Sequence, residues 1–118
     1  MTNTVTIVIQ NAPYKDDNKA WHALRFAGAA LAEDLAVRVH LLDDGVEVGR
    51  RGHQPPEGVV NLEQLLAELI ECGLEVRACG MALDGCGIGE GDMVAGIEKG
   101  SMKALAEWVK TSDQVMTF

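Results

Sequence analysis

Apolar residues gather in short β-branched runs, which alternate with segments where apolar residues recur every three or four positions. Residues 5–10 are nearly all apolar, as is typical of a strand covered on both faces in a parallel sheet, and we expect this strand near the sheet's centre. Residues 37–42 and 74–78 predict two further strands, and residues 114–118 predict a short last one. The intervals between these runs leave room for helices.

Two of those intervals predict helices with clear ends. Residues 18–33 carry apolar side chains at helical spacing. Residues 61–73 do the same, with Asn61 and Gln64 in the pattern of a capping box and Gly73 as a helix stop. The order strand, helix, strand is therefore expected to repeat along the chain, as it does in βαβ units.

The remaining segments are less regular. Residues 46–60 are rich in glycine, proline and arginine and predict a long loop, either a lid or an oligomer contact. Residues 85–91 contain too many glycines for a regular element throughout. Short helices are expected over residues 92–99 and 101–110, the second capped by Ser101. Together these elements predict one domain, residues 1–118, with three layers and a mostly parallel sheet of four to five strands.

Charge and composition narrow the function classes. The formal net charge of −8 argues against nucleic acid and against an anionic membrane surface as partners, since both attract basic proteins. No apolar run approaches the roughly 18 residues of a membrane span, and the first residues lack the features of a signal peptide. We expect a cytoplasmic protein.

The chemistry is expected at Cys79, which ends the third predicted strand. Ligands of open parallel sheets bind beyond the carboxyl ends of the strands. If the residues from Met81 onward form a helical turn, its free backbone N–H groups and dipole favour the thiolate of Cys79. This cysteine is therefore a candidate nucleophile or sulfur carrier.

Other polar residues give weaker signals. Cys72 is expected to be a packed structural thiol, and Cys86 is either a second reactive thiol or a bystander. Asp43 and Asp44, at the end of the second predicted strand, either orient a loop or act on a substrate proton. The glycine spacing fits neither a dinucleotide fingerprint nor a P-loop, and no histidine pair has the spacing of a metal site, so neither cofactor nor metal is expected.

Several segments together resemble one known family, the DsrE-like small sulfur-relay proteins. The chain carries, in the family's order and spacing, the segments Asn11-Ala-Pro-Tyr14, Ala23-Leu-Arg-Phe-Ala27, Leu41-Leu-Asp-Asp-Gly-Val46, Pro55-Pro-Glu-Gly58, Asn61-Leu-Glu-Gln-Leu-Leu66, Val76-Arg-Ala-Cys-Gly80 and Asp113-Gln-Val-Met-Thr-Phe118. The resemblance implies a flavodoxin-like fold, homo-oligomers (trimers or hexamers), and a cysteine that holds sulfane sulfur as a persulfide between a donor and an acceptor protein. Cys79 occupies the place of that cysteine.

The chain departs from the family pattern at two positions. Ala82 replaces a second cysteine found in many members, and Cys86 replaces an arginine before the following Gly-Ile. The positive charge that would support a thiolate is thus missing at that position. It would be restored if Arg50, Arg51 and His53 folded over the cysteine.

We therefore expect a sulfur carrier or sulfurtransferase built on Cys79, with Cys86 as a resolving thiol. Gly80, Met81, Asn11 and Asp44 are the residues expected to bind substrate or an anion. The alternatives are a non-catalytic oligomeric binding or regulatory subunit of the same fold, and a redox sensor that uses both cysteines.

Overall fold

The computed structural model describes residues 3–118 and contains one five-stranded sheet in which every strand is parallel to its neighbours. Along the sheet the strands follow the order β4-β3-β2-β1-β5. Their bounds are β1 (Thr4–Ile9), β2 (Ala36–Leu41), β3 (Glu75–Cys79), β4 (Ile97–Gly100) and β5 (Gln114–Thr117). The predicted three-layer, flavodoxin-like α/β architecture is confirmed. β1 is an interior strand, although β2 occupies the middle of the sheet.

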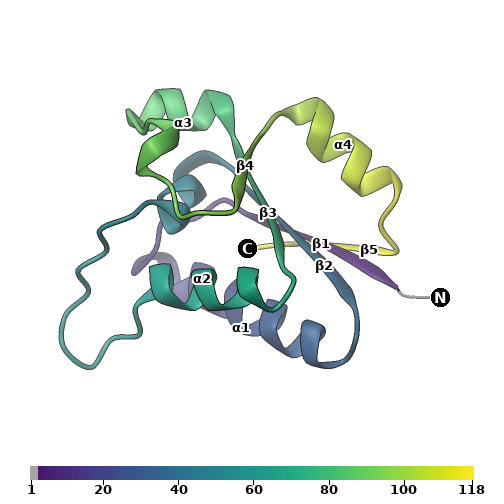
Figure 1. Cartoon of the computed structure of the whole chain (residues 1–118), viewed down its shortest axis with the longest axis horizontal. Helices are drawn as coiled ribbons and strands as arrows, with labels where there is room; N and C mark the ends of the chain where they lie inside the picture. Colours follow the sequence, from purple (N-terminus) through teal and green to yellow (C-terminus); the bar gives the residue numbers. More distant parts are fainter. Residues whose placement is uncertain (1–2) are drawn as a thin grey trace.

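Helices cover both faces of this sheet (Figure 1). α1 (Lys19–Ala32) and α2 (Leu62–Glu71) pack side by side on one face, and α4 (Met102–Lys110) lies on the other. The short α3 (Gly80–Cys86) follows β3 directly. Three 3-10 helices, η1 (Asp16–Asn18), η2 (Asp43–Gly49) and η3 (Glu90–Asp92), complete the described elements. Within residues 3–118, no helix combines the length and the apolarity needed to cross a membrane.

The two faces of the sheet differ in chemistry. Side chains that alternate along β1, β2 and β3 toward α1 and α2 are buried and apolar, namely Val5, Ile7, Ile9, Val37, Val39, Leu41, Val76 and Ala78. The register of the strands gives the α4 face the polar residues Thr6, Arg38, His40 and Arg77, together with Cys79. The first face forms the hydrophobic core, so the second is free to carry functional groups.

Most helix ends match the expected signals. Asn61 Oδ1 accepts a hydrogen bond from the Gln64 N–H at 3.1 Å, and Ser101 Oγ accepts one from the Ala104 N–H at 3.1 Å. Gly73 follows α2 with φ of 108°, a conformation that favours glycine. At the start of α1, by contrast, Asn18 makes no side-chain capping bond.

Two expectations for irregular segments were wrong. The helix expected over residues 92–99 is replaced by η3 and β4, because Ile97 pairs with Val76 in the sheet and this pairing outweighs local preference. The long loop begins at residue 50, since Val46 and Val48 are fully buried within η2. The expectation that the glycine-rich residues 85–91 do not form one regular element is confirmed, since Gly85 and Cys86 end α3, Gly87 has φ of 69° and η3 begins at Glu90.

Candidate functional site

Cys79 stands where a strand becomes a helix. It is the last residue of β3 and the N-cap of α3, which begins at Gly80, so the helical turn expected after the cysteine is present. Its own backbone is still extended, with φ of −61° and ψ of 122°. Only 5% of its surface is exposed. The thiol is thus at the expected edge of the sheet but is largely covered.

A lysine that the sequence analysis missed lies next to Gly80, the residue that follows this cysteine. A Cβ on Gly80 would come within 2.6 Å of Lys99 Cε, so the absence of a side chain at Gly80 leaves the path of the lysine open. The register pairs Lys99 with Ala78. Lys99 falls within the helix expected over residues 92–99, and only its position on β4 brings it next to Gly80. It also lines a cavity of about 130 Å³ between α3 and β4.

His40 is a second functional candidate that the sequence analysis did not single out. It is fully buried on β2, and neither ring nitrogen has a hydrogen-bond partner within the described chain. Burial lowers the pKa of His40, and the nearby Arg77 charge lowers it further, while the backbone of Ser101 opposes the shift without reaching normal hydrogen-bond geometry. An unpaired buried polar group costs about 1–3 kcal/mol. A histidine inside a largely apolar strand was the available sequence signal.

Trp108 of α4 covers this polar face of the sheet. The Arg77 guanidinium carbon lies 4.3 Å from the centroid of the Trp108 ring, and the His40 ring meets the indole edge-on at 6.3 Å between centroids. Arg77 Nε also lies 3.8 Å from a carboxylate oxygen of Glu98. Trp108 is itself buried, with 6% of its surface exposed. The indole therefore shields Arg77 and His40 from solvent.

Cys86 lies at the opposite end of α3 from Cys79. It is half-buried, and burial raises the pKa of its thiol, with the Glu47 and Asp44 carboxylates of η2 raising it further. Seven helical residues span about 10 Å, whereas the Cα atoms of a disulfide lie about 4.4–6.8 Å apart. A disulfide between Cys79 and Cys86 therefore requires α3 to unwind, and the resolving role of Cys86 remains a prediction.

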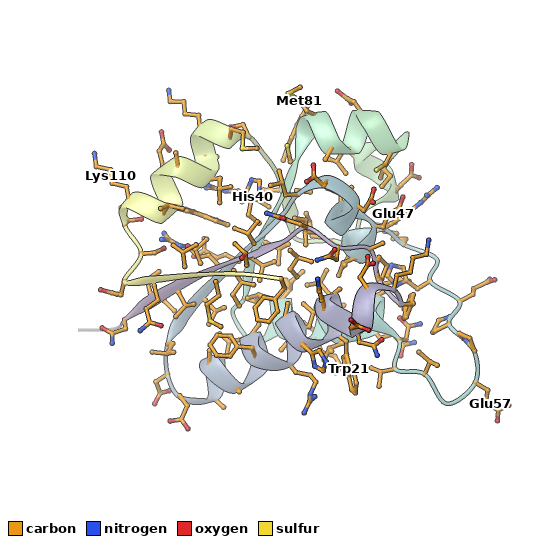
Figure 2. The ribbon with its side chains drawn as sticks, turned by 180° about the vertical axis from the view of Figure 1, so that it is seen from behind. Trp21, His40, Glu47, Glu57, Met81 and Lys110 are labelled. Atoms are coloured by element: carbon orange, nitrogen blue, oxygen red, sulfur yellow. The ribbon has the colours of Figure 1, made fainter. Side chains whose placement is uncertain are left out.

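The other predicted binding residues are spread around the same edge of the sheet. Asn11 is half-buried just after β1, and Asp44 is exposed on η2, where it lines an open cavity of about 400 Å³ with Lys15. Met81 is 85% exposed and points away from the body of the molecule (Figure 2).

Two further expectations concern Cys72 and the metal sites. Cys72 was expected to be packed but is exposed, because it follows the last residue of α2 on the outer side of the helix. Over residues 3–118, no group of three or more His, Cys, Asp or Glu side chains is arranged to hold a metal ion.

The long loop is attached at a distance from the cysteine. Arg51 Nε donates a hydrogen bond to the Met93 carbonyl at 2.8 Å. The ring of His53 is held between the Tyr14 hydroxyl and the Glu47 carbonyl, both at 2.8 Å. The Tyr14 hydroxyl also accepts a hydrogen bond from the Leu62 N–H at 3.0 Å, and burial raises the pKa of Tyr14. Arg51 and His53 are thus engaged elsewhere, whereas Lys99 lies against Gly80 and Arg77 shares the face of Cys79.

Comparisons with known proteins agree over the whole described chain. The model of the DsrE/DsrF-like family matches residues 3–118. The chain is 43% identical to the uncharacterized protein MK0008 of Methanopyrus kandleri, over 98% of this chain and 94% of that protein. It is 34% identical to protein YchN of Escherichia coli, over 97% of each chain.

Solved structures show the same relationship. The crystal structure of the YchN protein from E. coli superposes with a TM-score of 0.89 at 33% identity and covers 100% of both chains. MTH1491 from Methanobacterium thermoautotrophicum, a protein of unknown function, superposes with a TM-score of 0.73 at 16% identity, over 98% of this chain and 99% of that one. The second match is evidence for the shared fold alone.

Proposed function

Because the chain belongs to the DsrE/DsrF-like family, we propose that it is a sulfur carrier that holds sulfane sulfur as a persulfide on Cys79. The observation that carries the proposal is the position of Cys79, which ends β3 and immediately precedes the first residue of α3. At that position a thiol lies at the carboxyl edge of a parallel sheet, where ligands of such sheets bind.

The surroundings of Cys79 support an anionic sulfur. Lys99 reaches Gly80, the next residue in the chain, and Arg77 shares the face of the sheet on which Cys79 lies. These two cations are candidates for the positive charge that Cys86, in place of the family's arginine, does not supply. The exposed Met81 next to Gly80 offers an apolar contact to a donor or acceptor protein.

The alternative function rests on the burial of the thiol. At 5% exposure, Cys79 is reached by a partner only if α3 or a neighbouring side chain moves. A non-catalytic oligomeric binding subunit would need no such movement. A cavity of about 220 Å³ lined by Tyr14, Trp21 and Val59, among others, would then hold the ligand.

The two functions are distinguished by the mass of the intact protein after incubation with a polysulfide. We expect a gain of one sulfur atom that is lost in Cys79→Ser. Cys86→Ser and Cys72→Ser serve as matched controls, and the second is essential because Cys72 is exposed and open to nonspecific reaction. A gain that disappears only in Cys72→Ser, or no gain in any protein, would reject the carrier function and favour the binding subunit.

Assembly belongs to this proposal as well. We propose homo-oligomers, trimers or hexamers, as the family resemblance implies. In the described chain, exposed apolar side chains on α4 and β5, including Met102, Val109 and Val115, provide surface for contacts between copies. Light scattering on the purified protein measures the mass of the assembly, and a monomer at every concentration would contradict this part of the proposal.

A further inference from the structure

His40 is a fully buried polar side chain to which the proposed function assigns no role. Neither its Nδ1 nor its Nε2 has a hydrogen-bond partner in residues 3–118. Buried polar groups are almost always paired, so an unpaired imidazole in the interior indicates a ring kept available for another group.

The ring extends from β2 across β3 toward β4. His40 pairs with Arg77 of β3, yet its Nε2 lies 2.8 Å from the position that a Cβ would take on Gly100 of β4. Gly100 is the residue paired with Cys79. In the strand order β4-β3-β2, a ring that starts on β2 and reaches Gly100 must pass over β3. Figure 2 places His40 between α4 and α3.

Cys79 shares this face of the sheet. Side chains alternate along a strand, so Cys79 projects to the same face as Arg77, and paired residues place His40 there too. Neighbouring strands lie about 4.8 Å apart, so Cys79 is the β3 neighbour of the Gly100 position that Nε2 reaches, although the thiol and the ring are not hydrogen-bonded within the described residues. The absent side chain at Gly100 provides the space that the imidazole needs.

We propose that His40 accepts the proton of the Cys79 thiol when sulfur is loaded; this rests on the proposed carrier function. As the proton moves to Nε2, the sulfur of Cys79 attacks the outer sulfur of a donor persulfide, R–S–SH. One S–S bond forms and the donor's S–S bond breaks, with its electron pair leaving on R–S⁻, which takes the proton back from the imidazolium. The net reaction converts Cys79–SH and R–S–SH to Cys79–S–SH and R–SH, with no external oxidant or reductant.

The environment of His40 favours the neutral form of its ring, which is the form able to accept a proton. Burial and Arg77 lower its pKa, so the ring is neutral at pH 7 and retains a free lone pair. The β-strands contribute the following charged groups to this face: Arg38, Glu75, Arg77 and Glu98. From α4 the ring is covered by Trp108, while Lys103, Glu107 and Lys110 are exposed, and β1 contributes the uncharged Thr6 and Val8.

The test measures alkylation of Cys79 by iodoacetamide as a function of pH, in a chain where Cys72→Ser and Cys86→Ser leave one thiol. We expect His40→Gln to slow alkylation at pH 7 by about tenfold or more, with the rate recovering at higher pH, because thiolate formation loses its proton acceptor. His22→Gln, at an exposed histidine of α1, is the matched control and should leave the profile unchanged.

A His40→Gln profile that coincides with its parent at every pH would overturn the proposal, and so would a parent thiol that never reacts. Nitrogen-15 NMR of His40, compared between the parent and Cys79→Ser, leaves the histidine intact and covers the case of a variant that does not fold. Coupled groups shift each other's titration, so identical His40 titrations in both proteins would also overturn it.

Alkylation requires no sulfur donor, so the result is independent of the carrier function. A chain whose Cys79 reacts in a His40-dependent way but takes up no sulfur would retain the link between the two residues and reject the carrier. If the His40→Gln chain takes up sulfur on Cys79 as well as its parent, the carrier function is retained and the role of His40 is rejected.

Discussion

Cys79 of β3 lies directly opposite Gly100 of β4, so the residue across from the thiol has no side chain. The space is occupied from a third strand, since His40 of β2 extends its ring to Gly100. One glycine therefore determines whether a histidine and a cysteine on separate strands occupy the same part of the sheet.

Gly100→Ala should destabilise the protein by about 1–3 kcal/mol, because the new Cβ would lie 2.8 Å from His40 Nε2 and 3.1 Å from Arg77 Cβ. Gly85→Ala is the matched control, since a Cβ there meets nothing within 4 Å and alanine is the better helix former. Urea unfolding measures both. Equal stability of Gly100→Ala and the parent would show that the His40 ring readily moves aside.

The stability of the protein should depend on the ionisation of His40. Its pKa is lowered in the folded state, so the unfolded chain binds the proton more readily. The unfolded chain is therefore stabilised relative to the folded one as the pH falls below about 6.5. The free energy of unfolding should therefore decrease from pH 7 to pH 5, and His40→Gln should remove that part of the decrease. Denaturant unfolding across this range measures it, and the same slope with and without His40 would contradict the assignment.

Lys99→Met should slow sulfur uptake by Cys79 about two- to fivefold at low salt, because an exposed charge contributes at most about 1 kcal/mol. The difference should shrink as salt is added and the charge is screened. Lys103→Met, at an exposed lysine near the start of α4, removes the same charge elsewhere. Time-resolved mass spectrometry compares the rates, and an equal loss in both variants would mean that only net charge matters.

Tyr14→Phe should loosen the loop that follows η2. The hydroxyl links His53 to the Leu62 N–H, and removing it leaves both groups without this partner, at a cost of about 1–3 kcal/mol. Limited proteolysis should then cut within residues 50–61 sooner than in the parent. Unchanged cleavage would show that Arg51 and the other attachments hold the loop without Tyr14.

The elements that sequence analysis predicted well are specified by the pattern of apolar residues within their own segments. Periodicity located β1, β2, β3 and the helices α1, α2 and α4, and the end of β3 was enough to place Cys79. β4 was missed because its four residues include Glu98 and Lys99, and pairing with β3 makes them a strand.

The site residues Lys99 and Gly100 were missed for the same reason, namely that β4 was not predicted. With β4 assigned to a helix, nothing indicated that Lys99 runs past Gly80 or that Gly100 lies opposite Cys79. The position of the His40 ring against Gly100 depends on three strands far apart in the chain, so no local sequence signal predicts that contact. Cys72 was misplaced because residues just after a helix have no periodic rule for burial.

The pairing of β1 with β5 bears on how the chain folds during synthesis. Of the five strands in the described residues, β1 comes first in the chain, yet one of its two edges pairs with β5, the fifth in order, where Val5 meets Gln114. Until β5 is made, this largely apolar strand has an open edge and is able to pair with neighbouring nascent chains. The interval between the synthesis of β1 and its pairing with β5 is thus the one in which we expect the chain to be most prone to aggregation and most dependent on chaperones.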